Sequence, residues 1–285
     1  MTPATRVALH LLSVGRCRHP EWVTIRGGGL RAVEFPALVA LIIHPTRGPI
    51  LYDTGYADRF HAVTQPFPER LYRWVTPPEL PPDERLLTQL AAHGIAAGDI
   101  SRVLVSHLHA DHVGGLRDLP RARFSALEAD VAVARSTSAL RMLLRGVIPA
   151  LLPPDFAARL DPVDARPVRE LGAAWTPFAR AFDLLGDGSL LGVPLPGHAP
   201  AQLGVLLRTT DDEDVLLAAD ACWSARAVRE ARRPSRLAGF IFDDWARYCA
   251  TLAGLGEVSA RQPGLTIIPS HCATTIETWQ ARRRP

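Results

Sequence analysis

The sequence contains no lysine, so arginine supplies every basic side chain apart from the histidines. The formal net charge is only +3, and the basic clusters at 232–233 and 282–284 are short and lack interleaved aromatic residues. A nucleic-acid-binding surface would need a longer basic stripe. We therefore expect no nucleic-acid partner, and we attribute the exclusive use of arginine to the base composition of the genome.

Long apolar runs are also absent, since no stretch reaches the roughly twenty apolar residues of a membrane-spanning helix. The apolar run at 7–12 lacks the cleavage pattern of a signal peptide. The four cysteines are scattered and form no CxxC pair, so they predict no disulfide framework. Together these absences favour a cytoplasmic protein without a membrane partner.

The chain has 285 residues without an internal repeat or linker, a length that fits one large α/β domain. Apolar periodicity predicts strands at 7–12, 37–43, 49–52, 102–106, 122–125, 203–207, 215–218 and 265–268, a hairpin at 182–193, and helices at 83–93 and 242–255. We expect Asp83 to cap the first helix. The order of strands, then mixed strands and helices, occurs twice and favours two sheets packed face to face.

Metal-binding side chains are concentrated in the sequence SHLHADH at 106–112. This segment follows a short apolar strand and precedes two glycines, so it belongs to a turn inside the fold. A turn allows closely spaced side chains to point at one centre, whereas a strand would alternate them between two faces. Imidazole nitrogen and carboxylate oxygen are ligands for zinc and related divalent ions.

The HxHxDH motif resembles that of the metallo-β-lactamase-fold hydrolase superfamily. Other motifs stand in the order of that family: Asp53-Thr54-Gly55, Pro196-Gly197-His198, Asp220 at a strand end, and Pro269-Ser270-His271. The resemblance covers nearly the whole chain. It implies an α/β fold, a four-layer αβ/βα sandwich in which two mixed β-sheets pack face to face with helices outside. It also implies that 1–285 form a single domain with a helical insertion around 127–175, near the mouth of the active site.

The resemblance further implies a set of metal ligands. His107, His109 and His198 would bind one ion, Asp111, His112 and His271 would bind a second, and Asp220 would bridge both. The expected cofactors are two divalent ions, with zinc as the first choice and iron, manganese or cobalt as alternatives, because nitrogen and oxygen ligands accept all four. A single histidine at a strand end is more often structural, but the presence of all the motifs in order outweighs that reading.

The expected chemistry is hydrolysis by a hydroxide that bridges the two ions. Asp111 and Asp220 are the predicted catalytic residues, since either could pass a proton to the leaving group. Asp53 is predicted to orient a ligand histidine, with capping of its own turn as the alternative.

Within the superfamily, the chain most resembles the quorum-quenching N-acyl-homoserine lactonases. Diiron redox relatives replace the second histidine by glutamate, whereas this chain has His109. Secreted zinc β-lactamases lack the histidine after the aspartate, whereas this chain has His112. Too few residues follow His271 for the helical domain of glyoxalase II, and the inserted domain of RNA-processing relatives is not evident.

Two residues depart from the pattern of those lactonases. Trp223 occupies a position where many of them carry a tyrosine that contacts the substrate, and Ala199 replaces a threonine. We expect Trp223 to bind substrate through its indole N–H. The apolar segment 139–152 is either a hydrophobic wall of the substrate site, or ordinary core, or a dimer interface.

The primary prediction is therefore a lactonase or carboxylic-ester hydrolase that acts on a small molecule with an apolar portion, as a monomer or a homodimer. A phosphodiester or thioester hydrolase with the same ions is the alternative among enzymes. A metal-binding sensor or accessory protein without activity is the alternative from another class.

Overall fold

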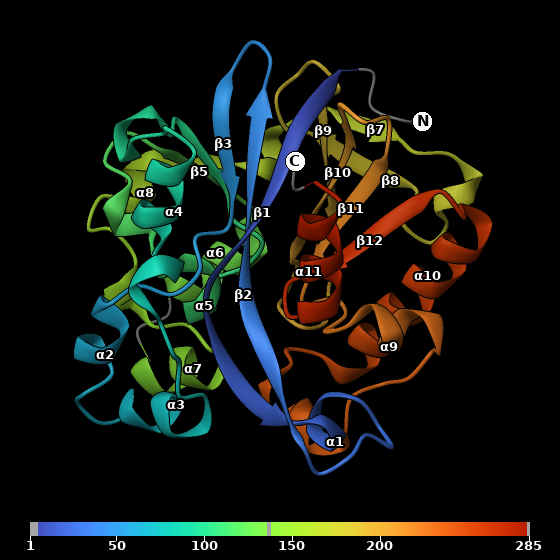
Figure 1. The fold of residues 1–285 in the computed structure, drawn as a ribbon. Helices are drawn as coiled ribbons and strands as arrows, with labels where there is room; N and C mark the ends of the chain where they lie inside the picture. The colour runs from blue at the N-terminus through green and yellow to red at the C-terminus, as the bar shows by residue number, and fades with distance from the viewer. Residues whose placement is uncertain (1–4, 136–137, 284–285) are drawn as a thin grey trace.

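The computed structural model describes residues 5–135 and 138–283. A mixed sheet structure occupies the middle of the molecule, and helices cover it on both sides (Figure 1). Within the described residues, the sheet has twelve strands: ten are hydrogen-bonded along one path, and the last two strands of the chain branch from it. The sheet divides into two halves, which join where the start of β1 (Arg6–Pro20) meets the end of β10 (Leu203–Thr209). These halves are the two face-to-face sheets that the sequence predicts.

The first half contains the strands of the N-terminal part of the chain. Their bounds are β1 Arg6–Pro20, β2 Ala32–His44, β3 Gly48–Tyr52, β4 Arg102–Leu104, β5 Arg123–Ala126 and β6 Leu160–Pro162. β1, β2 and β3 are antiparallel neighbours, whereas β3, β4, β5 and β6 are parallel. The carboxyl ends of the parallel strands therefore lie at one edge of this half.

The second half is formed by the C-terminal part of the chain. Its strands are β7 Val168–Glu170, β8 Arg180–Asp183, β9 Leu190–Pro194, β10 Leu203–Thr209, β11 Asp214–Ala219 and β12 Leu265–Pro269. β7 to β11 are antiparallel in chain order, and β12 is parallel to β11. One parallel pair, β11 with β12, thus also places two carboxyl ends side by side.

Alternation along the strands produces three hydrophobic clusters and hence four layers. In β2, Leu38 and Ile42 belong to the cluster between the two halves, whereas Val39 and Leu41 belong to the cluster under the first group of helices. In β11, the same period of two residues separates Leu217 from Leu216, which faces the second group of helices. Because successive strand side chains point to opposite faces, both halves are buried on both sides.

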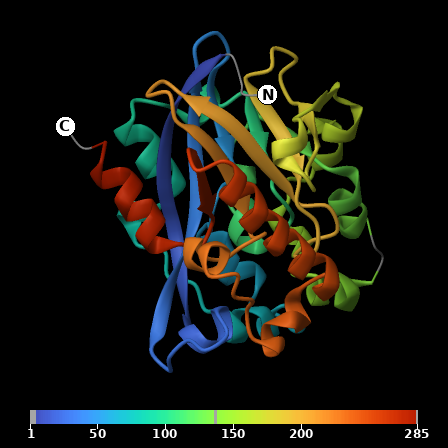
Figure 2. The same ribbon diagram turned by 90° about the vertical axis from the view of Figure 1, so that its right-hand side faces the viewer.

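Most helices are short and pack on the outer faces. Their bounds are α1 Glu21–Thr24, α2 Arg59–Val63, α3 Arg70–Val75, α4 Leu86–Ala92, α5 Ala110–Val113, α6 Glu128–Ala134, α7 Ala139–Leu144, α8 Phe156–Arg159, α9 Ala225–Arg229, α10 Trp245–Arg261 and α11 Ala273–Ala281. α10 is the longest and lies across the outer face of the second half (Figure 2). Among the described residues, no helix is long and apolar enough to cross a membrane.

The predicted elements are present, with shifted ends. β1 continues to Pro20, beyond the predicted end at 12, because its pairing with β2 resumes after an irregularity between Ser13 and Arg16. The predicted cap at Asp83 is wrong: Asp83 lies in a 3₁₀ turn, and α4 begins at Leu86 without a side-chain cap. The second predicted helix begins at 245 rather than 242, because the Asp244 side chain accepts the N–H of Arg247 and ends the preceding loop.

Candidate metal centre

The histidine cluster lies where β4 ends at the edge of the first sheet half. β4 is parallel to β3, with Tyr52 opposite Leu104, so the residues that follow these two strands are neighbours. The peptide N–H of Asp53 donates to the carbonyl of Leu104 at 2.9 Å. His109 then takes an extended conformation and begins α5, so the chain turns sharply within the motif. This turn allows alternate residues of the motif to face one centre.

Asp53 holds this turn from its buried position next to the motif. Its backbone is left-handed, with φ of 61°, which aspartate tolerates better than most residues. Its carboxylate accepts hydrogen bonds from the Ser106 N–H, the Ser106 hydroxyl and His112 Nδ1, each at 2.7 Å. Burial raises the pKa of Asp53, and His112 and Ser106 oppose that rise. The contact directs His112 Nε2 toward the centre, as the sequence predicts for a residue that orients a histidine.

The parallel pair β11 and β12 brings Asp220 and His271 to the same place from the other half. Ala219 pairs with Pro269, so the residue after each strand emerges beside the other. His271 Nδ1 donates to the carbonyl of Pro36 at 2.8 Å, which fixes the ring. His271 Nε2 then lies 3.0 Å from Asp220 Oδ2 and 3.5 Å from Asp111 Oδ2.

His198 comes from the loop between β9 and β10. Gly197 has a φ of 123°, and a Cβ atom there would lie 2.1 Å from the backbone nitrogen of Tyr248. Only glycine permits this approach of the loop to the start of α10. His198 Nε2 lies 3.0 Å from His109 Nδ1 and 3.2 Å from Asp220 Oδ2.

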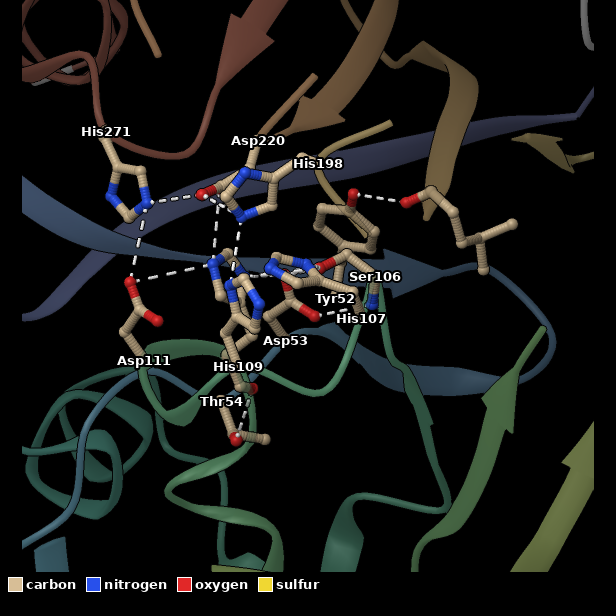
Figure 3. A network of polar contacts seen from close by, with 12 residues as sticks. Tyr52, Asp53, Thr54, Ser106, His107, His109, Asp111, His198, Asp220 and His271 are labelled. Atoms are coloured by element: carbon tan, nitrogen blue, oxygen red, sulfur yellow. Dashed lines mark hydrogen bonds and ion pairs between the residues drawn. The ribbon is translucent and has the colours of Figure 1, made fainter. Parts of the chain in front are cut away.

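All seven predicted ligands therefore converge, and Figure 3 shows those it labels pointing toward one another. The described residues form three groups in which the ligand atoms lie within 4.8 Å of one another: His107 with His109 and His198, His107 with His112 and Asp220, and Asp111 with His112 and His271. Every member of these groups is buried. His107 Nε2, His112 Nε2 and Asp220 Oδ1 are buried without a hydrogen-bond partner. Orphaned acceptors facing one centre fit divalent metal ions, which supply the missing partners. The role of each side chain as a ligand stays a prediction.

The electrostatics of the cluster also suit cations. Burial lowers the pKa of His107 and His198 well below the usual value, so these imidazoles are neutral, as metal ligands must be. Burial also opposes a charge on His112, but Asp111, Asp53 and Asp220 outweigh it and raise the pKa. Several buried carboxylates in one place require positive charge close by.

An aromatic wall borders the cluster on the side of the second half. Trp223 lies between Phe35 and Phe242, with ring centroids 5.7 Å and 5.2 Å away. Its indole N–H donates to Asp220 Oδ2 at 3.2 Å. The N–H therefore already has a partner among the predicted ligands. The predicted contact of Trp223 with substrate stays a prediction.

Several residues that belong to no motif lie close to the cluster. Ser106 links Asp53 to His107, and the backbone of Arg145 hydrogen-bonds to the ring of His109. Tyr72 is close enough to Asp111 that this carboxylate, after burial, raises the pKa of the phenol. Ser106 could have been found as the residue beside the motif, whereas Arg145 and Tyr72 follow no sequence signal.

A small pocket opens beside His109 and His198. Its apolar lining comes from Leu108, Val133, Val147, Ala199, Pro200 and Ile241, and Arg145 pairs with Asp243 on its rim. Of the apolar segment 139–152, Val147 lines this pocket, whereas Ile148 and Leu151 are buried in the core. Leu140 and Leu144 are exposed, so the segment divides between pocket wall, core and surface.

Comparisons with known proteins agree with this geometry. A family model described as the metallo-beta-lactamase superfamily matches residues 33–248. The chain is 28% identical over 270 residues to N-acyl homoserine lactonase AttM of Azorhizobium caulinodans, covering 90% of this chain and 92% of that protein. It is 27% identical over 251 residues to N-acyl homoserine lactonase AiiB of Agrobacterium fabrum, covering 85% and 81%.

Solved structures show the same fold. An N-acyl homoserine lactone hydrolase with N-hexanoyl-L-homoserine at its catalytic metal centre has a TM-score of 0.67 and 17% identity, with 98% of this chain and 97% of that chain covered. AidC, described as a dizinc quorum-quenching lactonase, has a TM-score of 0.64 and 18% identity, with 96% and 90% covered.

Proposed function

Because the chain belongs to the metallo-beta-lactamase superfamily, we propose that it is a metal-dependent hydrolase that opens the lactone ring of N-acyl homoserine lactones. The convergence of seven buried histidine and aspartate side chains on one centre carries this proposal. Relatives named as N-acyl homoserine lactonases, aligned over most of their length, support the choice of substrate. A sensor without activity would not need the complete ligand set.

In this proposal the ligands divide as the motifs imply. His107, His109 and His198 would hold one ion, Asp111, His112 and His271 would hold the other, and Asp220 would be a further ligand. We propose zinc, since nitrogen and oxygen donors suit it and AidC is described as dizinc, although iron, manganese and cobalt accept the same donors. Bound there, two divalent ions supply Lewis acidity and a water whose pKa is lowered toward neutrality.

The chain's own residues move the proton. Asp220 Oδ2 already accepts contacts from His271 and Trp223, so it is the less available base. Asp111 has longer contacts, 3.5 Å to His271 Nε2 and 3.7 Å to His112 Nε2, which leave its carboxylate free to take a proton. The water oxygen bonds to the lactone carbonyl carbon, the ring C–O bond breaks, and Asp111 returns the proton to the departing ring oxygen. The product is the ring-opened hydroxy acid.

We propose that the apolar side chains around the small pocket beside His109 and His198 contact the part of the substrate that lies nearest the centre. Its walls combine Leu108, which lies inside the motif, with Val147 from the segment 139–152 and Ile241 at the end of a 3₁₀ helix. The lining is mixed, because Asp130, Arg145 and Asp243 stand beside these apolar side chains, so only its apolar part favours contact with an apolar group of the substrate. The segment 127–175, which we propose as an insertion in a single domain, contributes one side of this pocket.

Zinc-reconstituted protein tested against N-acyl homoserine lactones, aryl esters, thioesters and bis-aryl phosphates separates the candidates. We expect about two metal ions per chain and hydrolysis of the lactones, measured as acid release. Protein that holds the metals but cleaves only the phosphodiester or the thioester would replace the lactonase assignment with one of those activities. Protein that holds the metals and cleaves nothing would indicate a sensor.

Three further properties belong to this proposal. We propose a reducing, cytoplasmic location, which agrees with four free and buried cysteines. We propose a monomer or homodimer that acts on a small molecule, without a nucleic-acid or membrane partner. Fractionation and light scattering would test location and oligomeric state.

A further inference from the structure

The five histidines of the centre are not held in the same way. Four rings have a partner for the nitrogen that faces away from the centre: Ser106 for His107, Arg145 for His109, Asp53 for His112 and Pro36 for His271. His198 differs, because its Nδ1 is buried and has no hydrogen-bond partner within the described residues. No side chain therefore fixes the orientation of the His198 ring through that nitrogen.

The position of His198 must then come from its backbone. The N–H of Asp243 donates to the carbonyl of His198, and the N–H of Asp244 donates to the carbonyl of Gly197, each at 3.0 Å. These bonds hold the loop from the side of α10. At the base of the loop, the N–H of Leu195 donates to the carbonyl of Gln202 at 2.8 Å, which closes the turn.

Asp130 holds the same loop from the opposite side. It lies on α6 and is 2% exposed. Its carboxylate accepts the N–H of Ala201 at 3.1 Å and the N–H of Gln202 at 2.9 Å. Gln202 has a φ of 37°, in the left-handed region that is unfavourable for a residue with a long side chain. The two peptide N–H groups donate to the Asp130 carboxyl oxygens and stabilise this conformation.

Within the described residues, the Asp130 carboxylate makes no contact that would explain its burial other than these two hydrogen bonds. Within residues 5–135 and 138–283, no ion pair joins Asp130 to an arginine or histidine, so its polar contacts are those two peptide N–H groups. Burying a carboxylate without a cation destabilises a protein, so a role other than stabilising the fold is expected for Asp130. Asp130 also lines the pocket beside His198, so it contacts the loop that carries this predicted ligand and lies next to the same pocket.

We infer that Asp130 is the positioning residue for His198: it fixes the loop 199–202, and through the loop it sets the ring of the one ligand that lacks a side-chain partner. The inference rests on the proposed function, because it assumes that His198 binds metal. Residues that orient metal ligands from outside typically account for about 10- to 100-fold in metal affinity. Loss of the Asp130 carboxylate should therefore weaken the binding of one of the two ions.

The experiment compares D130N and D130S with the matched control D164N at pH 8. Asp164 accepts the N–H of Glu128 at 2.7 Å, so D164N perturbs the start of the same helix without touching the His198 loop. Zinc affinities are measured by competition with a chelator, and cobalt-substituted protein gives an absorption spectrum of each site. We expect D130N and D130S to bind one ion about 10- to 100-fold more weakly, with a changed cobalt spectrum. D164N should match the wild type, and excess zinc should restore activity to D130N.

Wild-type affinity for both ions in folded D130N and D130S would overturn the inference. Failure of both variants to fold without metal would also overturn it, because Asp130 would then support the fold rather than His198. The proposed function is judged separately on the wild type. If the wild-type protein binds two ions and opens lactones, that function stands whatever the variants show.

Discussion

The two sides of the metal centre are built by different means. The side in the first sheet half uses one strand, one turn and one helix, so His107, His109, Asp111 and His112 lie within six residues of sequence. The side in the second half uses the ends of three separate segments, which carry His198, Asp220 and His271. The first side is a local structure, whereas the second exists only when distant strands have paired.

This difference has a consequence for how each ligand is held. Asp53 and Ser106 fix the local side through side-chain hydrogen bonds at 2.7 Å. On the other side, the His271 ring contacts a carbonyl of β2, and the backbone of the His198 loop contacts the Asp130 side chain of α6 and peptide groups at the start of α10. Substitutions far from the motif should therefore change the positions of the ligands on the second side more than those on the first.

Removal of a ligand on the local side should have the largest effect. We expect H109A to lower kcat/KM for the lactone by about 1,000-fold or more, because catalysis by a two-metal site needs a complete coordination shell. The control is H61A, which changes an exposed histidine outside the cluster and should leave kcat/KM unchanged. Near-normal turnover of H109A with both metals bound would show that His109 is not a ligand.

Asp130, which supports the second side, should contribute a pH-dependent stability of its own. Burial raises the pKa of Asp130 to about 7 from 3.8 in the unfolded chain. The folded protein therefore favours the protonated carboxyl. This contribution to the free energy of unfolding is present below pH 4 and is lost as the pH rises toward 7.

Urea unfolding of metal-free wild type and D130N between pH 5 and 8 measures this contribution. Relative to D130N, the free energy of unfolding of the wild type should fall by about 1.4 kcal/mol per pH unit up to pH 7 and then stay constant. All other titrating groups are shared by the two proteins and cancel in the difference. A difference that does not change with pH would show that Asp130 is not a buried titrating carboxyl.

The same division explains what the sequence could predict. The motif at 107–112 is contiguous, so its residue types alone indicate a metal site. His198, Asp220 and His271 were identified only because their motifs resemble those of a family, since nothing local shows that three strand ends meet. Asp53 was predicted as an orienting residue on the same ground, and its contact with His112 has that geometry.

Residues that act through backbone groups could not be predicted. Asp130 accepts peptide N–H groups 71 and 72 residues later in the chain, and any residue type except proline at 201 would supply such a donor. The predicted cap at Asp83 failed for a related reason. Asp83 is a residue type that favours helix starts, but it lies in a 3₁₀ turn. Arg16, from a distant part of the sequence, forms an ion pair with Glu84 in that turn.

A smaller effect is expected when the support of the local side loses its charge. D53N retains a residue that tolerates the left-handed backbone of φ 61° but replaces the charged acceptor of three hydrogen bonds. We expect zinc affinity to fall about 10- to 100-fold. The matched control is D183N, since Asp183 is also buried and accepts N–H groups of Gly186 and Gly188. D183N should lower stability only, and equal losses of zinc affinity in both variants would contradict the role of Asp53.

The smallest effect should come from Trp223, which stands where the two sides meet. W223F removes the N–H that donates to Asp220 Oδ2 but keeps ring contacts with Phe35 and Phe242. Because Asp220 Oδ2 retains His271 as a partner, we expect kcat to fall by about 10-fold or less, with KM unchanged. W245F, which changes another tryptophan that stacks on Phe242, should leave both constants unchanged. A rise in KM without a change in kcat would instead assign Trp223 to direct substrate binding, because only uniform binding would have been lost.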